Sequence, residues 1–446
     1  MIVFSLIVPR AEAQMSPSMT NMGQAKFNDW ATRWEANING DSGNRYCDTA
    51  MGEDIAWLMQ PFLRGFYYGY MITNDTKWVD KLVDWTDSWV VRGVQEPDGY
   101  LGWPAIGAAG TDVDSLNTYY ADSMLGDAMA LRPIVQLSAE ILRTPALAAT
   151  YGAKARSYIA LSEQMFAKWD SRSAWKDTAN GGCISVVYAY GIDSNSWTWT
   201  AGYSQRNVAT NGFSHPNNKA NEVARWLLAM YDATKNRVYR DRAEKWFKLL
   251  KSRIHLSANG TTYEIWNYWE PAGPWDYKPD TSTKHWVGVH PNAGYYEIDT
   301  GGIIDGYEHG LAFTKDDINC LITTGIYTQR LWTALAPYNN AFQANFEANN
   351  NPSGWGGLGD TPWYLALQID VMAGMDKYGI PAAWKIQNFG CVMGPGTKAM
   401  DDADQDGANN LAEYKAGTSP TNSLSVLKIT QGKVNSSTNC VIGGKV

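Results

Sequence analysis

Histidine, asparagine and tyrosine side chains gather in two segments of this chain, and each segment leads into a stretch with helical periodicity. Residues 214–222 read SHPNNKANE, and residues 290–299 read HPNAGYYEID. Amide and imidazole groups can neutralise a carboxylate beside a weakly acidic C–H bond, while a tyrosine or histidine moves the proton. These residue types therefore suit β-elimination from a uronic acid unit of a polysaccharide.

Each of these side chains has an expected role. Asn221 would hydrogen-bond the substrate carboxylate, and Arg330 would anchor the acidic sugar through paired hydrogen bonds. Tyr296 or Tyr295 would act as acid and base, with His290 as base or orienting group. The structural alternative is that the asparagines cap a helix and the tyrosines belong to the core.

The remaining histidines divide by context. His215 and His285 lie in loops beside Gly, Pro and Asn and are further catalytic candidates. His255 and His309 lie within helical patterns and are expected to be structural. The chain has no H-E-x-x-H motif, and no Gly-rich phosphate loop follows a strand. A catalytic zinc and nucleotide chemistry are therefore not expected.

Residues 290–306 resemble the histidine–tyrosine segment of toroidal polysaccharide lyases of the hyaluronate and chondroitin AC type. There too a His-x-Asn opens the segment, Tyr and Gly follow, and the helix carries Ile-Asp-Gly, as residues 304–306 do here. An Asn-containing segment after a Pro opens an earlier inner helix in that family, a place that Asn221 could fill. The family's tyrosine base aligns near Asp299, whereas this chain offers two tyrosines a turn earlier.

Toroidal alginate and glucuronan lyases are similar in kind and place the tyrosine elsewhere. In that arrangement Tyr338, downstream of Arg330, is the candidate. The resemblance implies a secreted lyase that cleaves a uronate-containing polysaccharide. A polyanionic substrate would need a locally basic cleft, for which the candidates are Arg206, Lys219, Lys284 and Arg330.

Two other functions stay open. A glycoside hydrolase would need two facing carboxyl groups roughly 5–10 Å apart. Glu270 in WNYWEPAG is the most attractive of these, because surrounding rings raise the pKa of a carboxyl group. The carboxyl candidates in loops or at helix starts are Asp122, Asp127, Glu270, Asp299 and Asp360. A non-catalytic glycan-binding protein would use the aromatic loops without convergent His, Tyr and Asn.

Tryptophan and tyrosine are unusually frequent, with 21 Trp and 25 Tyr against 11 Phe. Trp and Tyr combine a flat apolar face with a polar group, and many stand here in Gly/Pro-rich segments. Such rings suit the C–H faces of sugars, although they could equally fill the loops of a large fold. The expected substrate-binding residues are Trp103, Trp266, Trp269, Trp355 and Asn218.

Helical patterns alternate with Gly-, Pro-, Asn- and Trp-rich loops along residues 22–392. The expected helices are Glu53–Tyr70, Lys77–Val91, Tyr119–Leu142, Ala148–Trp169, Asn221–Thr234, Val238–Arg253, Ile303–Phe313, Asp316–Leu335 and Pro362–Met375. Apolar, small-residue helices alternate with amphipathic ones, which predicts an inner ring wrapped by an outer ring. The predicted fold is all-α, an (α/α) toroid of about six or seven helical hairpins. Strand signals are few, the best being Cys183–Tyr190 and Thr261–Trp269.

Residues 400–420 form a different kind of segment. Its DADQDG stretch and the glutamate at position twelve match a calcium loop, in which carboxylates form an oxygen cage. The predicted ligands are Asp402, Asp404, Asp406, Asn410 and Glu413. The loop resembles the dockerin and thrombospondin type 3 class, which implies structural Ca²⁺. Residues 421–446 are expected to begin an incomplete β-module.

The composition and the first residues of the chain limit its expected location and binding partners. Residues 1–14 read as a signal peptide with an A-x-A cleavage site, although no positive charge precedes the apolar run. No other stretch predicts a membrane span, and the net charge of −8 argues against nucleic acid. The five widely spaced cysteines permit one or two disulfides: Cys47, Cys183, Cys320, Cys391 and Cys440. We expect an exported protein whose partner is a polysaccharide.

Overall fold

A computed structural model describes most of the chain. The described residues are 21–39, 44–96, 98–106, 119–185, 191–193, 199–200, 212–349, 352, 355–425, 434–435 and 439–440. Among them, no helix combines the length and apolar character needed to cross a bilayer. The predicted signal peptide, residues 1–14, lies outside the described residues.

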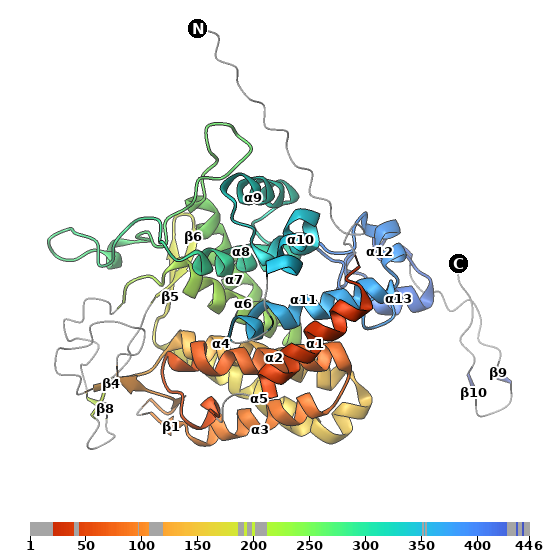
Figure 1. Cartoon of the computed structure of the whole chain (residues 1–446). Coiled ribbons are helices and arrows are strands. Elements are labelled where there is room, and N and C mark those ends of the chain that lie inside the picture. Colours follow the sequence, from red (N-terminus) through yellow and green to blue (C-terminus); the bar gives the residue numbers. More distant parts are fainter. Residues whose placement is uncertain are drawn as a thin grey trace, which may run out of the picture.

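α-Helices dominate the described structure (Figure 1). They are α1 (Gln24–Asn39), α2 (Gln60–Thr73), α3 (Lys77–Val91), α4 (Met124–Arg143), α5 (Pro145–Ser171), α6 (Asn217–Thr234), α7 (Arg237–Arg253), α8 (Ala293–Glu308), α9 (Lys315–Thr328), α10 (Asn340–Asn349), α11 (Trp355–Ala373), α12 (Ala382–Phe389) and α13 (Asn410–Ala416). Shorter helical turns are η1 (Tyr46–Asp48), η2 (Ile55–Met59), η5 (Pro274–Asp276) and η6 (Thr333–Tyr338).

Neighbouring helices close an inner ring. α2 packs on α4, α4 on α6, α6 on α8, and α8 on η6, which in turn packs on α10. The ring of Phe346 on α10 lies 4.1 Å from that of Tyr364 on α11. α11 then packs against α2 and completes the circle. The observed fold is therefore the all-α toroid of helical hairpins that the sequence predicted.

Outer helices cover this ring. α3 packs on α2, α5 on α4, α7 on α6, and α1 on α11. α4 is buried along nearly its whole length, whereas α7 buries one face, which includes Tyr239, Trp246 and Leu250. Helices buried on all sides and helices buried on one side thus alternate along the chain, as the periodicity predicted.

The connections differ between the two ends of the inner helices. Residues 74–76, Thr144 and residues 235–236 are short links that follow α2, α4 and α6. Long segments instead precede α4, α6 and α8, and comprise residues 92–123, 172–216 and 254–292. Each of these long segments leads into the N-terminal end of an inner helix, namely α4, α6 or α8. Long loops held by a rigid scaffold commonly carry a site.

Short antiparallel strands occur within the long segments. β1 (Val94–Gln95) pairs with β2 (Leu101–Gly102), and β5 (Trp175–Thr178) pairs with β6 (Gly181–Ile184). A four-stranded sheet has the order β3-β4-β7-β8. Its strands are β3 (Ala105–Ile106), β4 (Tyr119–Ala121), β7 (Gly191–Asp193) and β8 (Trp199–Thr200). Near the C-terminus, β9 (Val434–Asn435) pairs with β10 (Asn439–Cys440).

Several helix starts differ from the prediction, and two of them have a clear local reason. The helix expected from Tyr119 begins at Met124, because residues 119–121 pair in the sheet and Ser123 caps the helix. The helix expected from Ile303 begins at Ala293, where the Asn292 side chain accepts the N–H of Gly294. Polar and small residues in its first turns conceal the apolar periodicity there.

The predicted strand at Thr261–Trp269 was wrong in extent. Only Tyr263 pairs, in an isolated bridge with Leu256. The other predicted strand is present as β6, while residues 186–190 lie outside the described residues. Cys47, Cys183 and Cys391 are buried free thiols, and Cys320 is buried as well.

Candidate active site

A cavity of about 310 Å³ lies inside the ring of inner helices. Its walls come from α2, α4, α6, α8, η6 and α11, so it occupies the centre of the toroid. The polar residues that line it are Arg64, Tyr68, Arg132, Gln136, Glu222, Arg225, Glu297, Asp305 and Glu308. We call this cavity the central pocket.

Ion pairs organise the pocket wall. Arg225 Nε donates to Asp305 Oδ2 at 2.6 Å, and its Nη1 donates to Glu222 Oε1 at 2.9 Å. Arg132 Nη1 donates to the other Glu222 oxygen at 2.6 Å. Glu222 is therefore held between two guanidinium groups, and Asp305 shares one of them. The Asp305 side chain keeps 33% of its surface exposed, against 3% for Glu222.

These pairs set the charge states of the pocket. Burial alone would raise the pKa of Glu222, but Arg132 and Arg225 outweigh it and hold the pKa below its usual range. Burial would also raise the pKa of Asp305, but the positive charge of Arg225 outweighs this effect and the pKa is lowered. Burial, together with repulsion from Arg225, lowers the pKa of Arg132 to about 10. Both carboxyl groups are thus anionic at neutral pH.

Two further groups, Glu297 and Tyr68, line the pocket. Glu297 lies in the second turn of α8, two turns before Asp305, and its Oε1 accepts the backbone N–H of Ala334 at 3.1 Å. Tyr68 on α2 lies with its ring 5.9 Å from the guanidinium carbon of Arg64. Burial raises the pKa of Tyr68, while Arg64 and its neighbours oppose that rise. The pocket therefore offers carboxylates, arginines and one phenol.

The predicted His–Tyr segment splits into an accessible and a buried part. His290 and Tyr295 are partly exposed, with their rings 4.6 Å apart. Tyr296 is buried; its hydroxyl donates to the carbonyl of Trp266 at 3.1 Å and accepts the N–H of His290 at 2.8 Å. Arg330 lies 5.2 Å from the Tyr296 ring. Tyr296 therefore has its hydroxyl engaged inside the protein.

Asn221 is also buried and fully hydrogen-bonded. Its Nδ2 donates to Asp299 at 2.7 Å, and its Oδ1 accepts the indole N–H of Trp246 at 2.7 Å. Trp266 donates to the second oxygen of Asp299 at 2.8 Å. Burial raises the pKa of Asp299 to about 7 despite these two donors. This network joins α6, α7 and α8 in the core, away from the residues that line the central pocket.

The segment that opens α6 is buried as well. His215 and Asn218 expose 2% and 1% of their surface, and their side-chain polar atoms have no hydrogen-bond partner within the described part of the chain. Burial lowers the pKa of His215 to about 3, so its imidazole is neutral. Lys219 pairs with Glu53 at 2.7 Å. His285 lies in the loop before α8, and burial lowers its pKa too.

The tryptophans expected to bind sugar are mostly interior. Trp103 and Trp269 are fully buried and Trp266 exposes 3%, so no face is free to stack on a sugar ring. Each indole N–H is bonded within the protein, to Trp89 O, Ser214 O and Asp299 respectively. The side chains of Trp355 and Asp360 lie outside the described residues.

The other carboxyl candidates for a hydrolase lie in structural contacts. Asp122 and Asp127 bind the buried Lys168 at 2.6 and 2.8 Å. Glu270 accepts from Asn267 Nδ2 at 2.7 Å, beside a small cavity that lies outside the central pocket. Tyr338 is buried, and its hydroxyl donates to Glu308 at 2.6 Å. His309 pairs with Asp232 within the helical framework, as expected of a structural histidine.

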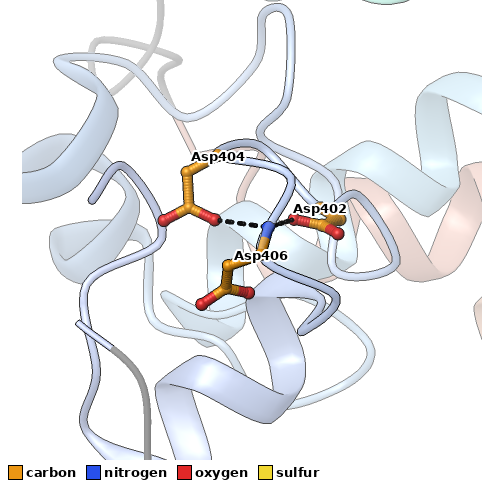
Figure 2. Close-up of side chains that lie close together, drawn as sticks. All are labelled: Asp402, Asp404 and Asp406. Atoms are coloured by element: carbon orange, nitrogen blue, oxygen red, sulfur yellow. Dashed lines mark hydrogen bonds between the residues drawn. The ribbon is translucent and has the colours of Figure 1, made fainter. Parts of the chain in front are cut away.

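The acidic loop brings three aspartates together (Figure 2). A carboxylate oxygen from each of Asp402, Asp404 and Asp406 lies within 4.8 Å of the others. The backbone N–H of Asp406 points between the other two carboxylates, at 3.2 and 3.3 Å. Glu413 is buried nearby, and burial with these three charges raises its pKa to about 7. Gly407 makes the turn with φ +95°.

Asn410 makes different contacts from the three aspartates. It is fully buried, and its Nδ2 donates to the carbonyls of Gly396 and Lys398, both at 2.7 Å. Its Oδ1 has no hydrogen-bond partner among the described residues. Lys398 Nζ in turn lies 3.5 Å from Glu308 at the central pocket. The acidic loop is thereby joined to the segment that forms part of the pocket wall.

Sequence reasoning missed Glu222, Arg225, Arg132 and Arg64 as site residues. Asp305 was visible only as part of the Ile-Asp-Gly motif. The one available signal was the spacing of Glu222 and Arg225, which places both on one face of α6. Arg132 lies 90 positions before Glu222, and no local pattern connects them.

No protein-family model matches the sequence, and no curated protein matches it. Three solved structures from Bacteroides thetaiotaomicron are similar in part. A family 76 glycoside hydrolase described as a mannosidase is 10% identical, over 77% of this chain and 82% of that one, with a TM-score of 0.38. A family 76 hydrolase from a bovine strain is 10% identical over 70% and 55%, with a TM-score of 0.33. A family 76 α-mannanase is 12% identical over 74% and 86%, with a TM-score of 0.29.

Proposed function

We propose that this chain is a carbohydrate-active enzyme that hydrolyses glycosidic bonds in the central pocket. The observation that carries the proposal is the presence of Asp305 and Glu297 on the pocket-facing side of one inner helix. Hydrolysis requires one carboxyl group to protonate the leaving oxygen and a second to activate water or attack the sugar. Arg225 holds Asp305 anionic, which suits the second role.

Glu297 is our candidate for the acid. It lies closer than Asp305 to the N-terminal end of α8, which follows the long segment 254–292. Eight residues on a helix correspond to a rise of about 12 Å. This backbone rise exceeds the ~5–5.5 Å between the carboxyl groups of retaining enzymes and also the ~6.5–9.5 Å of inverting ones. The proposal therefore requires the two side chains to extend toward each other along the pocket until their carboxyl groups reach the inverting range. Glu222 then acts through Arg225, by positioning the guanidinium that binds Asp305.

The burial of two of the predicted elimination residues also supports hydrolysis. Asn221 and Tyr296 have no exposed polar atom available for a substrate, because each is buried and hydrogen-bonded within the core. Asp305 and Glu297, by contrast, line a cavity large enough to admit part of a sugar ring.

The test is to incubate the purified protein with neutral and uronate polysaccharides and to record reducing ends and ultraviolet absorbance together. Hydrolysis predicts new reducing ends without an unsaturated product. Asp305→Asn and Glu297→Gln should each lower that rate by at least about a hundredfold. Glu163→Gln, an exposed residue on α5, is the matched control and should keep the rate. Full activity in Asp305→Asn would overturn the assignment.

Elimination in the same pocket is the second candidate. Arg64, Arg132 and Arg225 line it, and the mutual repulsion of the last two would be relieved by an anionic sugar. Tyr68 would then be the acid/base group, in place of the tyrosines named from the sequence. A rise in absorbance that disappears in Tyr68→Phe would establish this function and exclude hydrolysis.

We also propose that the acidic loop binds Ca²⁺ with a structural role. Three aspartates on alternate residues, a glycine turn and a buried glutamate supply the oxygen ligands that Ca²⁺ prefers. Asp402, Asp404, Asp406 and Glu413 would hold the ion, with Asn410 supporting the loop through its backbone contacts. The A-x-A site near the start of the chain supports export, to a compartment where calcium is abundant.

A further inference from the structure

We propose that Trp286 and Tyr268 form a platform that binds an uncharged hexopyranose unit of the glycan at the entrance to the central pocket. The inference rests on the proposed function and adds a substrate-binding position and a class of sugar to it. We use the term platform for Tyr268, Trp286, His290 and Tyr295.

The platform is a stack of rings. Tyr268 is stacked with Trp286 at a centroid distance of 5.8 Å and an angle of 16°, and with Tyr295 at 5.2 Å and 26°. His290 fills the side of the stack, 4.9 Å from Tyr268 and 5.8 Å from Trp286. Rings fixed in this way lose little conformational freedom when a ligand binds, because their rotamers are already set.

Trp286 is the exposed member of the stack. It shows 45% of its surface to solvent, and no other tryptophan whose side chain is described is exposed. Tyr268, which it covers, exposes only 9%. Val287 and Val289 on the same loop are each 47% exposed, so the apolar surface extends beyond the indole. A contiguous exposed apolar surface of this kind, rather than a single exposed ring, is typical of a binding site.

The polar atoms beside the platform suit hydroxyl groups. His290 Nδ1 accepts the backbone N–H of Asn292 at 3.0 Å, so Nε2 is the ring nitrogen that carries an N–H. That N–H can donate to a sugar hydroxyl. His285, also in contact with Trp286 at 6.0 Å, is neutral because burial lowers its pKa. Among the described residues no Lys or Arg lies over a ring of the platform, and Lys219, whose charge acts on His285, is already paired with Glu53 at 2.7 Å. A uronate carboxylate here would therefore compete with Glu53 for its cation, which favours an uncharged sugar.

The platform is joined to the central pocket through α8. The backbone N–H of His290 donates to Tyr296 in the first turn of this helix. Gly294 and Glu297, on either side of Tyr295 and Tyr296, line the pocket. A sugar unit on the platform would therefore lie beside the end of the pocket that holds the proposed acid, Glu297.

Affinity electrophoresis of the full chain in native gels tests this proposal without requiring turnover. The gels would contain a soluble mannan, a soluble glucan or a polyuronate. We expect a neutral polysaccharide to retard the wild type, and Trp286→Ala to weaken binding about tenfold or more. Trp286→Gln is a second variant, in case the first misfolds. Tyr327→Ala is the matched control. This ring is 71% exposed on α9, and its removal should leave polysaccharide binding unchanged.

Three outcomes would overturn the platform. They are equal retardation of the wild type and Trp286→Ala, retardation by the polyuronate alone, or no retardation by any polymer. The reducing-end assay is separate from this measurement. If Trp286→Ala binds normally while Asp305→Asn abolishes hydrolysis, the platform fails and the proposed function stands. If neutral glycan binding depends on Trp286 but no reducing ends form, the platform stands and hydrolysis fails.

Discussion

Glu222 on α6 and Asp305 on α8 meet at one guanidinium group, that of Arg225, at 2.9 and 2.6 Å. Arg225 thereby ties two neighbouring inner helices together at the central pocket. The contact fixes the position of Asp305 and also keeps it ionised. Structure and proposed chemistry therefore depend on the same side chain.

Arg225→Met should destabilise the fold strongly. It leaves Glu222 and Asp305 without their shared partner in a largely buried setting, and breaking such a pair costs about 3–5 kcal/mol. Urea unfolding followed by circular dichroism measures the loss. Arg242→Met removes a more exposed pair with Asp170 and should cost at most about 1 kcal/mol. Equal losses in both variants would contradict the role given to Arg225.

Asp122→Asn tests a carboxyl group that the sequence left as a catalytic candidate. Asp122 shares the fully buried Lys168 with Asp127 and also pairs with Arg172 at 3.2 Å, so the variant should lower the free energy of unfolding by up to about 3 kcal/mol. The kcat of the protein that remains folded should not change. A kcat that falls a hundredfold at unchanged stability would place Asp122 in the reaction instead.

His215 predicts sensitivity to acid. Its pKa is about 3 in the folded chain and about 6.5 when unfolded, so the unfolded state alone takes up a proton between these values. This residue therefore lowers stability as the pH falls from about 6.5 toward 3, by up to about 1.4 kcal/mol per pH unit, and has no effect above that window.

His215→Gln should flatten this part of the stability profile in chemical denaturation at pH 4.5, 5.5 and 7. His255→Gln changes an exposed histidine and should leave the slope as it is in the wild type. The same slope in His215→Gln and the wild type would show that His215 is not the group responsible.

Calcium should raise the melting temperature, and chelation should lower it again. An ion that binds only the folded chain stabilises it by about 2.7 kcal/mol at a hundred times its Kd. Glu413→Gln should remove most of the shift, because Glu413 is the buried carboxylate beside the three aspartates. Glu163→Gln should retain it. Calorimetry that finds the same calcium shift in Glu413→Gln would exclude this residue as a ligand.

The sequence predicted the ring and its helices better than the site. α3 was predicted at its observed bounds and α7 to within one residue, because apolar residues recur along one face of each. α1 was not predicted, although Phe27, Trp30 and Trp34 form its buried face. Polar residues between these rings weakened the apolar signal.

The residues of the central pocket could not be predicted from hydrophobic periodicity. Arg132, Glu222 and Asp305 come from three helices, and their contacts arise only when the ring has formed. The sequence also did not single out Trp286 among the tryptophans. Composition marks every loop tryptophan alike, and only the packed structure separates Trp286 from the buried Trp103 and Trp269.

Contact between the two ends of the ring has a consequence for synthesis. The backbone N–H of Met22 donates to Gln368, 346 positions later, and α1 packs on α11. Until the ribosome has made α11, α1 lacks one of its neighbours and the apolar flank of α2 stays open. Contacts of such long range form slowly and expose the nascent chain to aggregation. Chaperone demand should therefore peak just before α11 emerges, and a chain stopped before Gln368 should be recovered mainly as aggregate.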